Sequence, residues 1–568
     1  MGKETETLKG EGCDPCNAKV MQQEKEKALR SRINPGVFWP SFVIAVTFIS
    51  LGVTNQETFG KFLTNALDVI SVNFGWFYLL FSVFVIVFMI ILAFTRLGNI
   101  RFGGPDAKPE YTIYQWFTMA LCGGIGTGIL FWAMGEPIFH MAGPPAGLYA
   151  EPFSRKAGIF AVSQTIIHWT FAQYALYSAC GVAIGLMAYN RKKALSVTNI
   201  IEPFIPPRYK KPTKTFIGAA CLFCIVGAVS CSMAAGLMQI GAGLEFLYSI
   251  PAKPITWFII SASIIAMYII SAVSGIKKGM RILSSFCTRV FIFMLLFVLV
   301  AGPTVFILNI GTEAIGDMID NLFTRSLILP TMAETDTWPK DWIIQFMASF
   351  FVYAPIIGLF LTRLARGRTV RQFILMNIFA PSIFCAAWIS IWGGAAVYFQ
   401  HTGIFNVWEA VNTTGMESTI FTLLNNLPGG YVLSFVFIVA VFASFTTLAD
   451  PMASTMATLS TKGLLVEEEA PKYLKIIWGC AFGLIAFLLV ASNGANAVRG
   501  LFSIVGLPMA ILILILVICL IKEGFRLADM PGGMDCRSDD EVRAEREKAK
   551  ELEDQFALST DESARLSD

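Results

Sequence analysis

The sequence is poor in charged residues and in histidine. Of its 568 residues only 15% are charged and 55% are hydrophobic, whereas soluble domains carry roughly 25% charged residues. So few charges argue against a soluble multidomain enzyme, and the composition excludes disorder, collagen and coiled coil as descriptions of the whole chain. Three histidines argue against a multi-histidine metal enzyme, and a net charge of +3 indicates no nucleic-acid partner. The sequence therefore predicts a polytopic membrane protein.

Apolar runs that could cross a bilayer recur along the chain. A membrane-spanning helix needs about 20 apolar residues, and the sequence contains twelve such runs. They are too long and continuous for the strands of a barrel, so an all-α fold with about twelve transmembrane helices is expected. The runs cover approximately residues 36–54, 76–96, 114–134, 157–189, 215–247, 255–274, 287–310, 340–364, 372–399, 430–460, 473–492 and 499–521.

The distribution of Lys and Arg predicts the orientation. Cytoplasmic loops carry more Lys and Arg than external loops. The connections after the fourth, sixth and eighth spans are rich in these residues, and the alternate connections are poor. Both termini are therefore expected in the cytoplasm and the acidic seventh connection outside. Residues 1–35 form a polar N-terminal tail, 36–521 the twelve-helix domain and 522–568 a charged C-terminal tail.

Both tails contain features with two interpretations. Cys13 and Cys16 form a C-x-x-C pair, for which two thiols in a reducing cytosol is the simpler interpretation and a redox or metal role the alternative. The C-terminal tail has 14 acidic and 8 basic residues, hence a net charge of −6. Its stretch 539–556 is typical of an exposed charged helix. This tail is either simply solvated or a regulatory, partner-binding element.

The third span contains three glycines at two-residue spacing, Gly124, Gly126 and Gly128. Glycines at this spacing weaken a membrane helix, so the backbone can unwind, expose carbonyl groups and admit a ligand close to the chain. The alternative is close helix packing through small residues, which usually repeat every four positions. The spacing favours a broken helix.

Aromatic side chains form stripes on the third, fourth and eighth spans. Such stripes are often packing or interface belts, but several of them beside a breakable helix favour a ligand site. Rings without a partner carboxylate suit a quaternary ammonium group, held by cation–π attraction of about 0.5–2 kcal/mol per ring. The candidate rings are Trp169, Tyr174 and Tyr177 of the fourth span, Phe350 and Tyr353 of the eighth, and Phe139 of the third.

The tenth span carries hydroxyl groups beside Asp450-Pro451, namely Ser444, Thr446 and Thr447. This pattern predicts another interrupted helix that offers oxygens to a small cation or a proton. Hydroxyls that bond back to their own helix are the alternative interpretation.

Few other residues in the spans point to chemistry. Glu136 and Asp450 are the intramembrane acids of greatest interest, and His168 is expected to be a hydrogen-bonded structural residue. There is no catalytic constellation and no phosphate-binding loop in the sequence. Neither an enzyme nor ATP-driven transport is therefore expected.

From Asn34 to about Lys522 the chain resembles the betaine/choline/carnitine transporter family. The motifs that carry the resemblance are Gly124-x-Gly126-x-Gly128, Glu136-Pro137, His168-Trp169 with Tyr177, Ser274-Gly275-Ile276-Lys277-Lys278-Gly279, and Arg363-x-x-Arg366-Gly367-Arg368-Thr369-Val370-Arg371. The resemblance implies an inverted repeat of the amino-acid/sodium-symporter type, with halves at about 114–310 and 340–521. It also implies alternating access, a homotrimer and the plasma (inner) membrane.

The resemblance also implies site residues. The family's aromatic box falls on Trp169, Tyr174 and Tyr177, closed by the eighth span, where Phe350 lies within the stretch that is a tryptophan cluster in relatives. This difference predicts a pocket with weaker cation–π attraction and another shape. Leu448 replaces one of the two adjacent hydroxyl residues of sodium-driven members, which argues against a complete sodium site. Ser444 and Thr446 could rebuild that site, so sodium coupling is the first expectation and exchange the alternative. The candidate sodium ligands are Ile125, Ser444, Thr446 and Thr447.

These patterns together predict a secondary transporter for a methylated ammonium compound. Glycine betaine, carnitine, choline and trimethylamine derivatives all belong to this substrate class. No cofactor is expected besides a coupling sodium ion. The alternatives are a sodium-independent exchanger, a membrane sensor with a vestigial transport fold, and an amino-acid symporter of similar fold.

Overall fold

A computed structural model describes residues 33–541 except 55, 126–127, 275–276, 334, 463, 465–467, 492–494, 536 and 538–540. Cys13, Cys16 and Gly126 lie outside the described residues, as does nearly all of the stretch 539–556. The described part of the chain is built from helices, and its β-pairing consists of two isolated bridges. The predicted all-α fold is confirmed.

Within the described ranges, nine helices are long and apolar enough to cross a membrane, and a tenth is formed if one bent pair counts as a single span. Two shorter apolar helices correspond to the first and sixth predicted spans. The helices that match the twelve predicted spans are α2 (Pro35–Thr54), α3 (Gln56–Phe94), α4 (Ile113–Ile125) with α5 (Gly128–Ala142), α6 (Arg155–Trp169) with α7 (Phe171–Gly185) and the π-turn η3 (Leu186–Asn190), α8 (Pro207–Tyr248), α9 (Pro254–Ser274), α10 (Lys277–Ala301), the π-turn η5 (Lys340–Ile344) with α12 (Gln345–Leu364), α13 (Val370–Thr402), α16 (Gly430–Leu459), α17 (Lys472–Ala491) and α18 (Ala495–Ala528).

Further helical segments connect these spans. They are α11 (Thr304–Ser326), α14 (Val407–Thr414), α15 (Met416–Asn425) and the short turns η1 (Arg96–Asn99), η2 (Ala146–Leu148), η4 (Glu202–Phe204) and η6 (Pro531–Gly533).

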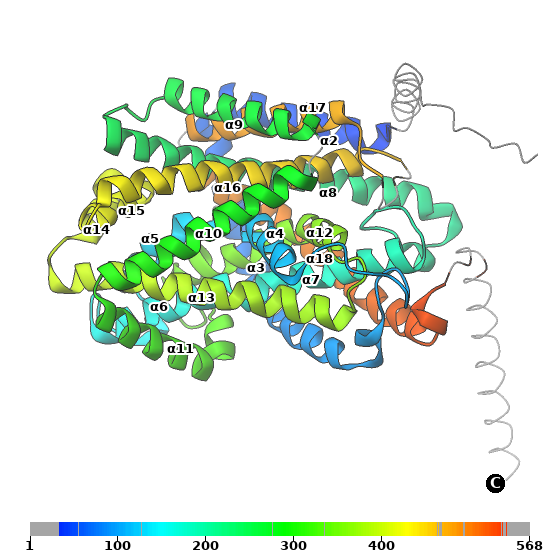
Figure 1. Cartoon of the computed structure of the whole chain (residues 1–568), viewed down its shortest axis with the longest axis horizontal. Coiled ribbons are helices and arrows are strands. Elements are labelled where there is room, and N and C mark those ends of the chain that lie inside the picture. Colours follow the sequence, from blue (N-terminus) through cyan, green and yellow to red (C-terminus); the bar gives the residue numbers. More distant parts are fainter. Residues whose placement is uncertain are drawn as a thin grey trace, which may run out of the picture.

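The spans α6–α7 and η5–α12 form the centre of the molecule. In each of them 94% of the apolar window is buried inside the protein, against 33% to 65% for the other single spans. Helices α7 and α12 pack so closely that a Cβ atom at Gly358 would lie 2.5 Å from Cβ of Cys180. In Figure 1, α9, α17 and α2 lie along one edge, α11 and α6 along the opposite edge, and α7 and α12 between them.

The predicted seventh span, 287–310, is wrong in its bounds. Helix α10 ends at Ala301, and α11 begins at Thr304 as a separate helix. Pro303 explains the break, because proline lacks the N–H that would continue the ladder and disfavours helical geometry in the residue before it. The Oγ1 atom of Thr304 donates to the carbonyl of Leu299 at 2.7 Å and so satisfies one group freed at this end.

The predicted interruption of the tenth span is also wrong. Helix α16 runs without a break from Gly430 to Leu459, through positions 450 and 451. Membrane helices tolerate an internal proline. Thr447 Oγ1 donates to the carbonyl of Ser444 at 2.7 Å, and Thr446 Oγ1 donates to that of Phe442 at 3.2 Å, so these hydroxyls bond back to their own helix, as the alternative interpretation expected.

Candidate functional site

The predicted break in the third span is present. Helix α4 ends at Ile125, α5 begins at Gly128, and the two axes differ by 61°. Glycine at position 128 has a steric reason, because a Cβ atom there would lie 2.8 Å from two ring carbons of Trp169. The indole of Trp169 therefore packs directly against the start of α5.

The fourth span breaks at Thr170, beside the same point. Thr170 leaves the helical region with φ −113° and ψ −128°, so α6 ends at Trp169 and α7 starts at Phe171. Gln173 Nε2 donates to the carbonyl of Trp169 at 2.8 Å, which satisfies a group near the break. The continuous span predicted for 157–189 is thus divided where the aromatic site begins.

Trp169 meets the eighth span through its ring edges. The centroids of Phe346 and Phe350 lie 5.3 Å and 6.0 Å from that of Trp169, at interplanar angles of 70° and 72°. Edge-to-face geometry of this kind is favourable for aromatic pairs. Of the predicted site residues, the structure brings together Trp169, Phe350 and Gly128.

Tyr174 and Tyr177 form a second aromatic group, further along α7. Their centroids are 6.1 Å apart at 88°, and both side chains are buried. The hydroxyl of Tyr174 lies 3.1 Å from Sγ of Cys385 on α13. The two tyrosines are three positions apart on α7 and contact each other, whereas the ring of Trp169 contacts α12.

The remaining two predicted rings lie apart from Trp169. Tyr353 donates its hydroxyl to the carbonyl of Ala228 at 2.6 Å, and its ring lies 5.8 Å from that of Phe502, so it packs between α8 and α18. Phe139 lies 5.6 Å from Trp342 and 5.4 Å from Trp408 at the far end of α5.

A carboxylate stands directly beside Trp169, contrary to the expectation that the rings have no acidic partner. Glu136 on α5 is fully buried. Its Oε2 atom accepts from Trp169 Nε1 at 2.7 Å. Its Oε1 atom lies 2.7 Å from Nδ1 of His168 and 3.3 Å from Nε2 of His140. His168 is hydrogen-bonded, as predicted.

The other partners of the two imidazoles identify their tautomers. Trp338 Nε1 is 3.1 Å from Nδ1 of His140. An indole N–H can only donate, so Nδ1 of His140 accepts and its Nε2 carries the hydrogen that points at Glu136. In the same way Gln164 Nε2 lies 3.0 Å from Nε2 of His168, whose Nδ1 donates to Glu136. Glu136 is therefore an ionised carboxylate held by three N–H donors.

The same three residues have the composition of a metal site, with candidate ligand atoms within 4.8 Å of one another. The Trp338 donor argues against that use. A metal on Nε2 of His140 would need a hydrogen on Nδ1, and that hydrogen would point at the indole N–H. The cluster is a hydrogen-bonded network of Glu136, His140, His168 and Trp169.

Sequence reasoning missed His140, Gln164 and Trp338 in this network. One signal was available for His140, because it follows Glu136 by four residues and so lies on the same helix face. Trp338 lies in the connection before η5 and could be assigned to the site only from the tertiary structure.

The candidate sodium ligands lie on two helices in contact, α4 and α16. Ser444 Oγ is fully buried and has no hydrogen-bond partner among the described residues. Thr446 and Thr447 donate to backbone carbonyls and keep oxygen lone pairs free to accept. Oxygen atoms are the ligands that small hard cations prefer. The side chain of Ile125 lies outside the described residues.

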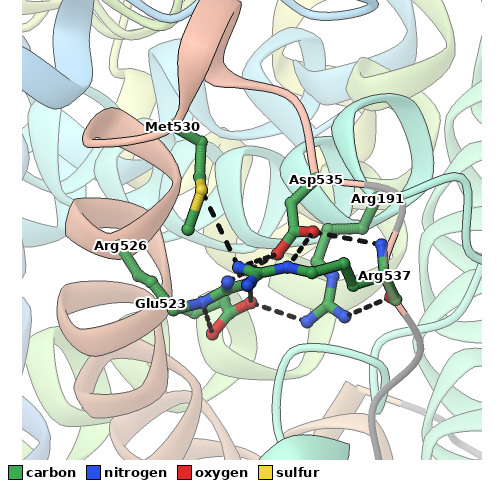
Figure 2. Close-up of polar contacts among 6 residues, drawn as sticks. All are labelled: Arg191, Glu523, Arg526, Met530, Asp535 and Arg537. Carbon is green, nitrogen blue, oxygen red and sulfur yellow. Dashed lines mark hydrogen bonds and ion pairs between the residues drawn. The ribbon is translucent and has the colours of Figure 1, made fainter. Parts of the chain in front are cut away.

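A second charged cluster ties the chain after α18 to the end of η3 (Figure 2). Arg191 Nη1 lies 2.8 Å from Glu523, and both side chains are fully buried. Arg526 lies 2.5 Å from both Glu523 and Asp535, and Arg537 lies 2.9 Å from Asp535. Burial alone would raise the pKa of Asp535, but hydrogen bonds from Arg537 and Arg526 hold it well below its usual range.

Residues 36–527 match the family described as "BCCT, betaine/carnitine/choline family transporter". The chain belongs to this family. It is therefore a multi-pass membrane transporter and not an enzyme, and the predicted family resemblance is confirmed.

Curated relatives agree with this family. The ectoine/hydroxyectoine transporter of Virgibacillus pantothenticus is 29% identical over 86% of this chain and 96% of its own. The glycine betaine transporter OpuD of Bacillus subtilis is 30% identical over 86% of this chain and 94% of its own. The high-affinity choline transport protein of Escherichia coli K12 is 27% identical over 87% of this chain and 72% of its own.

Proposed function

We propose that this BCCT-family transporter carries a methylated ammonium compound, such as glycine betaine, carnitine, choline or a trimethylamine derivative. The observation that supports the proposal is the position of Trp169. Its indole lies against the broken helix α4–α5, its edges meet Phe346 and Phe350, and its N–H donates to the buried Glu136. A cationic head group beside these rings gains cation–π attraction of about 0.5–2 kcal/mol per ring.

The charge of the cluster favours the same substrate class. With both imidazoles neutral, the network carries a net charge of −1 inside the protein, and Glu136 is fully buried. Opposite charges attract more strongly there than in water, because the effective dielectric constant is about 20 or lower. Hydrogen bonding of the indole to a carboxylate also increases the negative character of the ring face. Both effects favour the cationic end of the substrate.

Alternating access would act through the broken helices. Glu136 on α5 is hydrogen-bonded to the last two residues of α6, so these two helices move together at this point. Phe346 and Phe350 belong to α12, on the other half of the proposed repeat. A tilt of α12 relative to α5 and α6 would open or close the ring edges around Trp169, and so expose the substrate to one side of the plasma membrane at a time.

Sodium is our preferred coupling ion, with sodium-independent exchange as the alternative. Ser444 Oγ is buried and has no partner among the described residues, and with Thr446 and Thr447 it supports a cation at the contact of α16 and α4. Ile125 would contribute its carbonyl. The family further suggests a homotrimer with cytoplasmic termini, which mass photometry and accessibility labelling of single cysteines would test.

Uptake into proteoliposomes tests the substrate class. Trp169→Ala and Phe350→Ala are each expected to lower uptake of choline or glycine betaine about tenfold, since 1.4 kcal/mol corresponds to a factor of ten. Trp76→Ala is the matched control, because Trp76 is 54% exposed and its ring contacts Phe77 rather than the rings of the site. Unchanged uptake in both site variants would refute the aromatic site.

The same assay separates the alternative functions. Uptake of unmethylated amino acids alone would indicate an amino-acid symporter. A protein that moves none of these compounds, but loses a cellular output when residues 530–568 are deleted, would be a sensor. Counterflow without a sodium gradient would indicate exchange.

A further inference from the structure

The side-chain amide of Gln164, next to His168, has a hydrogen-bond partner for its nitrogen but none for its oxygen among the described residues. Its side chain is fully buried on α6, one turn before His168. Its Nε2 atom lies 3.0 Å from Nε2 of His168. Its Oε1 atom has no hydrogen-bond partner among the described residues. A buried amide oxygen without a donor is costly, so a state of the protein that supplies a donor is stabilised.

If the Gln164 amide rotates by half a turn, its Oε1 atom can accept a hydrogen bond from His168. The rotation exchanges Oε1 with Nε2 and places an acceptor where the donor was, next to Nε2 of His168. A protonated His168 could then donate from both ring nitrogens, to Glu136 from Nδ1 and to Gln164 from Nε2. The two orientations of one amide therefore match the neutral and the charged imidazole: Nε2 of Gln164 faces the neutral ring, and Oε1 faces the charged ring.

The other titratable members of the network lack this option. Nδ1 of His140 accepts from Trp338, so a proton there would face an N–H that can only donate. Glu136 already accepts from three N–H groups, which favour its ionised form. His168 is the position at which the network can take up a proton.

Charged side chains also lie on the helices around His168. Arg325 of α11 contacts Ser163 Oγ at 3.2 Å and the face of Phe160, and it is ion-paired with Asp317. Among the described residues, the elements packed against α6 carry Glu136 and His140 of α5, Glu313, Asp317, Asp320 and Arg325 of α11, Tyr174 and Tyr177 of α7, and Cys385 of α13, and Asp336 lies before η5. Glu136 is the one hydrogen-bonded to His168, so a proton on His168 changes the network from −1 to neutral.

We propose that His168, between Glu136 and Gln164, is a proton-binding site, and that its proton competes with the cationic substrate at Trp169. The link is the Glu136–Trp169 hydrogen bond, at 2.7 Å. When His168 is neutral, the charge of −1 behind the indole attracts the substrate cation. When His168 is protonated, this attraction is largely lost. The inference rests on the proposed function, because it requires a substrate that carries positive charge.

Linkage fixes the direction of the reciprocal effect. If protonation weakens binding of the cation, binding of the cation must weaken binding of the proton by the same factor. The transporter should therefore release protons when it binds substrate. After the proton is released, the network carries a charge of −1, which is paired with the substrate cation.

Binding of choline to the full-length protein, measured from about pH 5.5 to about pH 8.5, tests the proposal. The Kd of choline is expected to be about tenfold larger at the acid end. Titration calorimetry of the unmodified protein in two buffers of different ionisation heat should detect release of up to one proton per choline. A Kd independent of pH, or no proton release, would overturn the inference while leaving the proposed function intact. Absence of choline and glycine betaine binding at every pH would overturn both.

Variants of the network locate the proton. His168→Gln should remove the pH dependence, and His401→Gln, at an exposed histidine on α13, should retain it. Gln164→Glu should move the transition to higher pH, because a carboxylate stabilises the protonated imidazole. Gln164→Met, which offers no amide acceptor, should move it to lower pH. A transition that persists in His168→Gln, or that does not move in either Gln164 variant, would overturn the assignment.

Discussion

Substitution of Gly128 by alanine tests the packing on which the site depends. The added Cβ would lie 2.8 Å from Cη2 and Cζ3 of Trp169, whereas carbon atoms in contact are ordinarily about 3.5–4.0 Å apart. The indole cannot easily yield, because Nε1 is bonded to Glu136 and its edges meet Phe346 and Phe350. Overpacking of this kind costs about 1–3 kcal/mol.

The steric clash can lower either the stability of the protein or its affinity for substrate. If the indole stays in place, the free energy of unfolding falls by about 1–3 kcal/mol. If the indole moves, the Glu136–Trp169 bond is lost and the substrate Kd rises about 5-fold to about 100-fold, at 1.4 kcal/mol per factor of ten. Thermal unfolding and choline binding of the purified variant measure the two effects separately.

Gly316→Ala is the matched control. Gly316 also lies in a helix, α11, and no described atom lies within 4 Å of where its Cβ would stand. Alanine in an exposed helix interior is expected to be neutral or stabilising by up to about 1 kcal/mol. A Gly128→Ala protein that unfolds and binds choline like Gly316→Ala would refute the close approach of Trp169 to α5.

Three further predictions concern the charged cluster after α18 and the tenth span. Arg191→Ala leaves the buried carboxylate of Glu523 short of a partner and should lower the free energy of unfolding by about 3–5 kcal/mol, measured by thermal or denaturant unfolding. Arg96→Ala is the control: it breaks an ion pair whose side chains are 61% and 53% exposed, so its stability should be within about 1 kcal/mol of the parent. Because the pKa of Asp535 is lowered in the folded protein, its contribution to stability is fully present above the unfolded pKa of about 4 and is lost as pH falls from there towards the folded pKa. The stability difference between Asp535→Asn and the parent should therefore be constant from about pH 5 to about pH 7 and shrink towards pH 3. If sodium couples transport, Ser444→Ala should raise the sodium concentration needed for half-maximal uptake about tenfold. Ser263→Ala, which removes an exposed hydroxyl, should leave that concentration unchanged. The same sodium dependence in both variants would refute the role of Ser444.

Local sequence features predicted the elements whose cause is itself local. The alternating glycines predicted the break between α4 and α5, because weak helix propensity acts within a few residues. Pro303 and Gly302 were present in the sequence, but the apolar run continued through them, so the boundary of α10 was extended too far. At positions 450 and 451 the same kind of local signal was misleading, since α16 continues through them.

The site was predictable in part. The importance of Trp169 and Glu136 could be inferred from their residue types within apolar runs, but their hydrogen bond joins residues 33 positions apart. Trp338, bonded to His140 across 198 positions, carried no local signal at all. The ring partners of Trp169 were also uncertain, because Tyr174 and Tyr177 are nearer in sequence than Phe346 and yet contact each other.

The sequence by itself determined the membrane fold and the family, since apolar run length and short motifs depend on neighbouring residues alone. Only the tertiary structure decided which side chains share the site. A buried carboxylate is stable there because donors from α5 and α6 converge on it, and the tautomer of His140 follows from an indole on a distant connection. The scarcity of charge could be read from composition, but the position of the one buried charge beside the aromatic rings could not.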